Sequence, residues 1–298
     1  FDKIKGYKAG YRVLTNMFTP PKRMALVLGL PVEANRYKLV KAWRDKVKGG
    51  VKPVPPIEVK TGPVKENIHI GDDVDLFEFP VPKWHELDGG RYIGTGHMVI
   101  NRDPDEGWVN FGTYRVQAHD KSTASIHCSP GRHGEMIARK YWDRGLNCPA
   151  VVICGQDPML WLASTTRIPW GFSEYDYAGG LRNKPVEVVR GETTDLPIPA
   201  TAEIALEGEI LSPETELIKE GPFGEWTGHY GIGKYQSGDM VGRDLVFKVK
   251  SILHRNDPII CGAPPFAAIE TYGAFHLITH AAYLRDELDR QIPGIKGV

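Results

Sequence analysis

The sequence has few cysteines and no cysteine motif. Its 298 residues include 4 cysteines, and none of them forms a C-x-x-C pair. So few thiols in a chain of this length argue against a disulfide framework. Reduced cysteines are typical of the cytoplasm, which is the location that we predict.

Long apolar runs and an excess of either charge are also lacking. Polar residues interrupt apolar runs such as ICGQDPMLWLA well before about 18 consecutive apolar positions, so no membrane span is predicted. Lys and Arg together number 37, as do Asp and Glu. This balance gives no electrostatic reason to expect nucleic acid or an anionic membrane as a partner.

Turn residues, by contrast, are abundant. The motifs G-x-G-x-x-G, G-x-x-x-x-G-K-[ST] and H-E-x-x-H are absent, so an ordinary Rossmann or P-loop fold has no support. Instead, 33 glycines and 23 prolines separate many short segments. Several of these are β-branched or alternating and predict strands: YIGTGHMVINRD, WVNFGTYRVQAHD, STASIHCS, AVVICGQD, PVEVVRG, AEIALEGEIL and DLVFKVKSILHR.

The pattern of residues along the chain divides it into three regions. Residues 1–88 predict an α/β region, with a strand or buried segment at MALVLGL, a helix over 35–47 and an extended Pro-rich connector over 48–67. Residues 89–262 predict a β-barrel, interrupted by a helix over 133–145. Residues 263–298 begin a long helix and a further domain that we expect to be incomplete in this chain.

Two segments place ionisable groups among apolar or tightly turning residues. If WVNFGTYRVQ is one strand, Asn110 and Tyr114 share one face and Thr113 and Arg115 the other. Such an arginine can bind a carboxylate with two parallel hydrogen bonds, although a solvent-facing arginine is the alternative.

The segment EGPFGEW (220–226) sets two glutamates around a Gly-Pro-Phe-Gly turn. Neighbouring carboxylates push their pKa values apart, which can leave one of them protonated as a proton donor. A hairpin loop with incidental acids is the alternative.

Two further segments suggest a site that binds a cation and an anion. In SPGRHGEMIARKYW, His133 precedes a helix whose N-terminus attracts anions such as phosphate. In IPWGFSEYDYAGGL, Glu174 and Asp176 lie on one side if the backbone is extended. Asn110, His133 and Glu174 together would form a ligand set that suits Mg²⁺ or Mn²⁺. The alternatives are a capped surface helix and a solvent-facing acidic loop.

Several segments, taken together and in order, resemble the UbiD family of reversible decarboxylases, which use prenylated FMN. The resemblance runs from about Pro53 through Pro265. It rests on DGGRYIGTG, INRDP, WVNFGTYRVQ, SPGRHG, PIPATAEIALEGEI, EGPFGEWTGHY and RNDPIICGAPP. It implies an α+β fold in which a small N-terminal α/β domain precedes a central split β-barrel like that of flavin reductases, followed by the truncated start of a C-terminal α/β domain.

The resemblance also implies a catalytic trio and a cation set. Arg115 would orient the substrate carboxylate, Glu220 would hold Arg115, and Glu225 would deliver the replacement proton. Asn110, His133 and Glu174 would hold the Mn²⁺ or Mg²⁺ that anchors the cofactor phosphate, and K⁺ would bind backbone carbonyls of 164–169. The cofactor-binding residues implied are Asn110, Thr113, Tyr114, Arg115, Arg132, His133 and Glu174.

The implied activity is a non-oxidative, reversible decarboxylation through a covalent adduct with prenylated FMN. The expected substrate is an aromatic or α,β-unsaturated carboxylic acid, with CO₂ as co-product. Trp226 and Arg132 either face this substrate or serve in packing. A flavin prenyltransferase would supply the cofactor, and a homo-oligomer, dimer or hexamer, is expected. The alternatives are a non-catalytic flavin-binding barrel and a structural subunit of a multi-subunit carboxylase.

Overall fold

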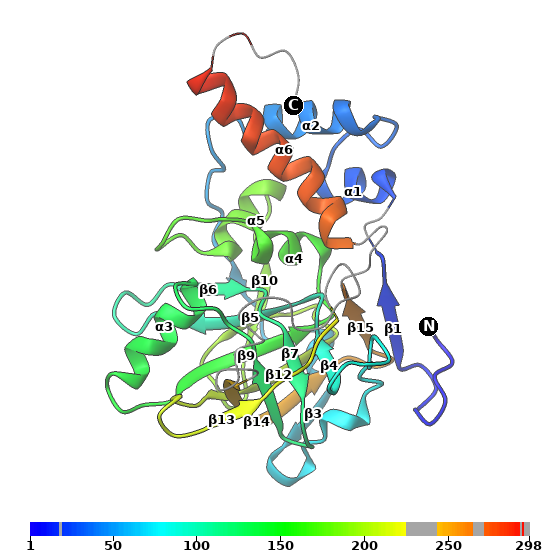
Figure 1. The fold of residues 1–298 in the computed structure, drawn as a ribbon, viewed down its shortest axis with the longest axis vertical. Coiled ribbons are helices and arrows are strands. Elements are labelled where there is room, and N and C mark those ends of the chain that lie inside the picture. Colours follow the sequence, from blue (N-terminus) through cyan, green and yellow to red (C-terminus); the bar gives the residue numbers. More distant parts are fainter. Residues whose placement is uncertain (18–19, 225–242, 265–270, 293, 295–298) are drawn as a thin grey trace.

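A curled antiparallel sheet forms the centre of the molecule. The computed structural model describes residues 1–17, 20–224, 243–264, 271–292 and 294 (Figure 1). The 10-stranded sheet has the order β4-β7-β8-β14-β12-β9-β5-β6, and β13 and β3 also pair with β14. Its strands are β3 (Asn67–Ile70), β4 (Arg91–Gly94), β5 (His97–Arg102), β6 (Val109–Gly112), β7 (Val116–Ala118), β8 (Thr123–Ile126), β9 (Cys148–Cys154), β12 (Ile204–Ile210), β13 (Leu217–Lys219) and β14 (Arg243–His254). The predicted mixed α+β, β-rich fold is therefore confirmed at this level.

The middle of the sheet is buried on both faces. In β9, Val151 and Ile153 belong to one apolar cluster and Val152 and Cys154 to the other. Side chains alternate between the faces of a strand, so a strand covered on both sides needs apolar residues at every position. This explains why AVVIC shows no alternation of apolar and polar residues. The helices α4 (Pro158–Thr165) and α5 (Glu174–Arg182) contribute to the first cluster.

The N-terminal region contacts both the sheet and the last helix. Strand β1 (Arg12–Thr15) pairs in parallel with β15 (Ile259–Gly262). Helix α2 (Arg36–Val47) lies beside α6 (Thr271–Gln291) and contacts α1 (Pro21–Leu28), as Figure 1 shows. Arg44 of α2 bridges Asp286 and Asp289 of α6, with both Nη2–Oδ distances at 2.7 Å. None of the described helices combines the length and the apolar character that a membrane crossing requires.

Two predictions of local structure needed correction, and a helix was missed. The segment MALVLGL is partly buried, but it is not a strand, because Pro21 at the first helical position and left-handed Gly29 at the C-cap define α1 around it. The segment after Ser173 is helix α5 and not an extended loop. The Ser173 side chain accepts a hydrogen bond from the Tyr175 N–H, and acidic residues occupy the first turn. Helix α4, capped by Asp157, was not predicted.

The Pro-rich connector is extended, as predicted. Apart from β2 (Ile57–Glu58) and the 3-10 turn η1 (Pro63–Lys65), residues 48–66 contain no regular element. Strand β2 lies at the edge of a 3-stranded sheet with β10 (Glu187–Arg190) and β11 (Pro197–Pro199). The remaining elements are the 3-10 turns η2 (Gly71–Asp73) and η3 (Leu76–Glu78) and helix α3 (His133–Trp142).

A buried carboxylate fastens this small sheet to the large one. Glu207 of β12 is fully buried and accepts hydrogen bonds from the backbone N–H groups of residues 192, 193 and 194 at 2.8–3.1 Å. The hydroxyls of Thr194 and Ser251 also donate to it, at 2.7 and 3.1 Å. The carboxylate therefore satisfies a turn whose donors have been removed from water.

Replacing Glu207 with alanine should lower the free energy of unfolding by about 3 kcal/mol, because several buried donors lose their acceptor. Urea unfolding followed by circular dichroism measures this change. Glu209→Ala, two positions along the same strand, is the matched control. Its partly exposed pairing with Lys250 should contribute less than about 1 kcal/mol. Equal losses in the two variants would contradict the role given to Glu207.

Candidate active site

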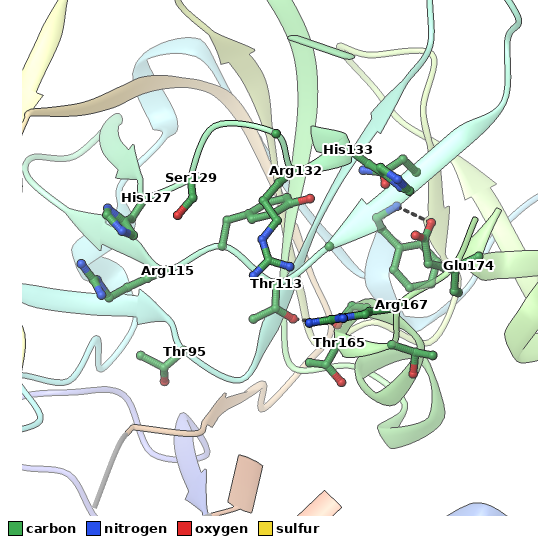
Figure 2. Close-up of a pocket in the computed structure, with 18 of the residues that line it drawn as sticks. Thr95, Thr113, Arg115, His127, Ser129, Arg132, His133, Thr165, Arg167 and Glu174 are labelled. Atoms are coloured by element: carbon green, nitrogen blue, oxygen red, sulfur yellow. Dashed lines mark hydrogen bonds between the residues drawn. The ribbon is translucent and has the colours of Figure 1, made fainter. Parts of the chain in front are cut away.

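A cavity of about 790 Å³ opens between β6, α3, α4 and Phe223. This volume lies within the range typical of sites for cofactors and small molecules. Figure 2 shows Arg115 and His127 at one end and His133 and Glu174 at the other, with Thr113 and Arg132 between them. The cavity therefore has two chemically different ends.

At the first end, Arg115 and Glu220 form a two-point ion pair. Nε of Arg115 lies 2.7 Å from Oε1 of Glu220, and Nη2 lies 2.9 Å from Oε2. Glu220 is only 6% exposed. Burial acts to raise the pKa of Glu220, but the hydrogen bonds and charge of Arg115 outweigh it and hold that pKa below its ordinary value. The solvent-facing alternative for Arg115 is thus wrong, and Glu220 is not an incidental surface acid.

The strand predicted over WVNFGTYRVQ is interrupted, and this interruption positions Arg115. Strand β6 ends at Gly112 and β7 begins at Val116. Asn110, Tyr114 and Arg115 all line the cavity, so the predicted division of Tyr114 and Arg115 between opposite strand faces is wrong. The Thr113 N–H donates to the Ser164 carbonyl (3.3 Å) and its hydroxyl to the His97 carbonyl (2.9 Å). These bonds replace the sheet pairing that the link has lost.

The Gly-Pro-Phe-Gly turn is held against the sheet by side chains from other segments. The Gly221 N–H donates to Oε1 of Gln117 at 2.9 Å, and the Gly224 N–H donates to Oδ1 of buried Asp88 at 2.9 Å. The turn places the Phe223 ring 4.7 Å from the Arg115 guanidinium carbon, within the range of a cation–π contact. Glu225 and Trp226 lie outside the described residues.

A histidine and an aspartate beside this ion pair were missed. Nδ1 of His127 lies 2.9 and 3.0 Å from the two carboxylate oxygens of Asp244. One ligand atom from each of His127, Asp244 and Glu220 lies within 4.8 Å of the others. Burial raises the pKa of Asp244, while His127 acts to lower it. His127 and Asp244 meet because Ile126 pairs with Leu245 across two strands. This strand register cannot be read from the sequence, so the pair was not predicted.

At the other end of the cavity, Glu174 is the buried carboxylate of the predicted cation set. One of its oxygens accepts a hydrogen bond from the Phe111 N–H at 2.8 Å. Among the described residues, no lysine or arginine forms an ion pair with it. Burial raises its pKa to about 8, which marks a carboxylate without a compensating positive charge. Such a group fits a bound cation.

Asn110 and His133 complete the predicted cation set in this cavity. The Asn110 side-chain N–H donates to Oδ1 of Asn101 at 3.0 Å, and both residues are buried. This bond fixes the amide orientation and leaves the Asn110 oxygen as a ligand atom. Burial, and then the charge of Arg132, lowers the pKa of His133, so its imidazole is neutral and able to bind a metal. The donor set therefore fits Mg²⁺ or Mn²⁺.

The N-terminus of α3 supplies the anion-binding side of the same end. Its N-cap residue, Arg132, makes no side-chain capping bond, which leaves the first turn open to an anion. The Gly134 N–H donates to the Tyr114 hydroxyl at 3.1 Å, so Tyr114 joins the helix start to the β6–β7 link. A side chain in place of Gly134 would meet the Tyr114 ring at 2.6 Å.

The segment after α4 forms the wall between the two ends. Residues 164–168 line the cavity, and the Ser164 hydroxyl lies 2.7 Å from that of Thr113. Figure 2 shows Arg167 directed toward Thr113, near Arg132. Arg167 was not singled out from the sequence. Its position gives the middle of the cavity a second positive side chain.

Comparison with known proteins identifies the family of this chain. A family model described as "UbiD: 3-octaprenyl-4-hydroxybenzoate carboxy-lyase Rift-related domain" matches residues 57–266. The chain belongs to the UbiD family. The predicted resemblance is therefore confirmed.

Two curated relatives of this UbiD chain are named as decarboxylases. The chain is 36% identical over 269 residues to a pyrrole-2-carboxylic acid decarboxylase of Pseudomonas aeruginosa, covering 88% of this chain and 51% of the relative. It is 33% identical over 268 residues to a phenolic acid decarboxylase of Bacillus subtilis, with 87% and 53% covered. The chain thus spans about half the length of the curated relatives that it matches.

Solved UbiD structures share the fold. The vanillic acid decarboxylase of Sedimentibacter hydroxybenzoicus, in its closed form, superposes with a TM-score of 0.82 at 30% identity, covering 98% of this chain and 60% of that one. An evolved dimeric form of the UbiD-class enzyme HmfF from Pelotomaculum thermopropionicum, in complex with prFMN, gives 0.82 at 30% identity, with 100% and 65% covered.

Proposed function

We propose that this chain forms the cofactor- and substrate-binding part of a prenylated-FMN-dependent decarboxylase acting on aromatic or α,β-unsaturated carboxylic acids. The observation that carries the proposal is the Arg115–Glu220 ion pair, whose Arg115 lines the same cavity as the Asn110, His133 and Glu174 donor set. One end of the cavity can hold a phosphate through a cation, and the other end can bind a carboxylate.

The cavity would hold the cofactor and its metal ion. Asn110, His133 and Glu174 would hold Mn²⁺ or Mg²⁺, whose charge would offset that of the cofactor phosphate, assisted by Arg132 and the α3 dipole. Thr113 and Tyr114 would lie beside its chain, and K⁺ would bind backbone carbonyls of 164–169. We assign the curled antiparallel sheet to the split β-barrel type of flavin reductases. We retain residues 1–88, 89–262 and 263–298 as the proposed domain division.

Arg115 would orient the substrate through the part of its guanidinium that Glu220 does not occupy. Glu220 takes Nε and one N–H of Nη2, and the second N–H of Nη2 and one N–H of Nη1 form a parallel pair of donors for the substrate carboxylate. Because Glu220 stays ionised, it fixes the guanidinium plane before substrate arrives. The rigid fork then holds the bond to be broken in one orientation, which lowers the entropy cost of reaching the transition state.

Loss of CO₂ leaves an electron pair on the substrate carbon, and a proton must replace the carboxylate. When bound, prenylated FMN supplies the electron sink that no side chain offers. We assign the proton donor to Glu225, on the basis of the family motif EGPFGE. In the reverse direction the same carboxylate would remove the proton before CO₂ adds.

The substrate class is proposed from the charges around the cavity. Arg132 and Arg167 would favour an acid that carries a second anionic or hydroxyl substituent, as in a hydroxybenzoate. The relatives named for pyrrole-2-carboxylic, phenolic and vanillic acids support a small aromatic acid. A flavin prenyltransferase as cofactor supplier and a homo-oligomer, dimer or hexamer, stay predictions.

His127 would be a positioning residue for the Arg115–Glu220 pair. Asp244 holds Nδ1 and so fixes the orientation of the imidazole beside the ion pair. His127→Asn should lower kcat by about 10- to 100-fold with little change in flavin content. His119→Asn, a histidine that does not line the cavity, should change kcat less than twofold. If His127→Asn altered only KM, His127 would belong to substrate binding instead.

Turnover of a panel of carboxylic acids tests the proposed function. Protein co-expressed with a flavin prenyltransferase should release CO₂ from at least one hydroxybenzoate or heteroaromatic acid and incorporate deuterium from D₂O at the vacated carbon. Native mass spectrometry of the active sample shows whether a second subunit is present. Flavin-loaded protein that turns over no acid would favour a non-catalytic flavin-binding barrel, and activity that appears only with a partner would favour a multi-subunit carboxylase.

A further inference from the structure

A second group of metal-binding side chains lies outside the cavity, where β3 and the turn η3 pack on β14. It consists of His69, Glu78 and His254, and one ligand atom from each lies within 4.8 Å of the others. None of the three lines the cavity. Their role is therefore separate from that of the cation set around Glu174.

The two histidines are brought together by strand register. His69 pairs with Ile252 in the antiparallel ladder, so His254 is its diagonal neighbour on the same face. Their Nε2 atoms lie 3.4 Å apart. Two imidazole nitrogens bound to one tetrahedral Zn²⁺, at bonds of about 2.1 Å, are separated by about 3.4 Å. The pair is already spaced for a shared metal ion.

The protonation of His254 also suits a metal ligand. Its Nδ1 donates to the Arg255 carbonyl at 2.8 Å, because a carbonyl oxygen can only accept. Because Nδ1 carries the proton of this hydrogen bond, Nε2 is the nitrogen whose lone pair can bind a metal ion. A hydrogen bond from Nδ1 to a carbonyl is the usual arrangement behind a metal-bound histidine.

Glu78 supplies an oxygen that is itself held in place. Its Oε1 accepts a hydrogen bond from the Tyr11 hydroxyl at 2.8 Å, and its Oε2 lies 3.7 Å from Nδ1 of His69. The rings of Tyr11 and Phe79 pack around His254, with centroids at 5.9 and 5.2 Å. The buried side of the group is thus rigid and apolar.

The opposite side is open to solvent. The side chains of His69 and Glu78 are 29% and 31% exposed, which gives an ion a route of entry and leaves room for water as a fourth ligand. Two histidines and a glutamate with one open position form a known zinc ligand set.

We propose that His69, Glu78 and His254 bind a zinc-class divalent transition metal ion. The ion would fasten β3 and η3 to β14, close to Tyr11 of the N-terminal segment, and would stabilise the folded chain without taking part in the reaction. Co²⁺ should also bind and report the ligand geometry through its visible absorption.

Metal-depleted protein titrated with Zn²⁺ tests this site. The protein should take up one more zinc per chain than His69→Gln does, and a hundredfold excess over Kd should raise the unfolding midpoint by at least about 3 °C. His69→Gln removes a direct ligand and should weaken this site at least about 10³-fold, so both effects are lost at the same zinc concentration. Glu78→Gln, at a partly exposed position, should weaken it as well.

His119→Gln is the matched control and should keep both the additional zinc and the rise in midpoint. Zinc bound at His133 or His127 is common to all these variants and cancels in the difference. Equal zinc content and equal midpoints in the unsubstituted protein and His69→Gln would overturn the proposal. Loss in His119→Gln of the same size as in His69→Gln would also overturn it.

Discussion

Arg115→Lys is expected to lower kcat/KM about 10²- to 10³-fold while the protein keeps its flavin. A lysine ammonium cannot reproduce the two parallel bonds to Glu220 at 2.7 and 2.9 Å and also present a planar fork to the substrate. Because this variant keeps the positive charge, it separates the effect of the guanidinium geometry from the effect of the charge. Steady-state decarboxylation of the acid found in the substrate panel measures the effect.

Arg102→Lys is the matched control for this result. Arg102 forms a largely exposed pair with Asp195 and does not line the cavity. Its replacement should change kcat/KM less than twofold, because exposed ion pairs contribute little. Near-normal turnover in Arg115→Lys would mean that charge alone is sufficient, and the orienting role of Arg115 would have to be abandoned.

His133→Ala is expected to yield protein with at least about tenfold less bound flavin and divalent cation. The change removes the nitrogen ligand of the cation set and leaves the buried Glu174 carboxylate without a cation to compensate it. The ratio of flavin to protein absorbance, together with metal analysis by mass spectrometry, measures both losses in the same sample.

Met136→Ala controls for damage to helix α3. Met136 lies one turn further along this helix and is 41% exposed, so its truncation perturbs the helix surface without touching the cavity. Its flavin and metal content should match those of the unsubstituted protein. A His133→Ala protein with a full complement of flavin would show that the cofactor phosphate is held in another way.

The strands could be predicted from the sequence because β-branched runs and turn residues act locally. Segments such as AEIALEGEIL formed strands as predicted. Helices α1 and α5 were misjudged because their caps outweighed the apolar pattern: Pro21 and Gly29 in one case, Ser173 in the other. The order of strands in the sheet depends on pairings between distant segments and could not be predicted from local pattern.

The candidate site was predictable where its residues lie in compact motifs. NFGTYR and EGPFGE indicated Arg115 and Glu220, and the structure joins them across 105 positions of sequence. His127 and Asp244 were missed because they meet only through the register of β8 and β14. Neither residue lies in a motif of its own. Motifs therefore indicated two residues that the fold brings together, and the sheet determined which additional groups surround them.

The identity of the bound cofactor tests the central claim most directly. The protein is co-expressed with a flavin prenyltransferase and purified, its absorption spectrum is recorded, and the extracted cofactor is weighed by mass spectrometry. We predict a mass equal to that of prenylated FMN, together with a spectrum that differs from that of ordinary FMN. Recovery of unmodified FMN, or of no flavin at all, would contradict the assignment of this cavity to prenylated-FMN-dependent decarboxylation.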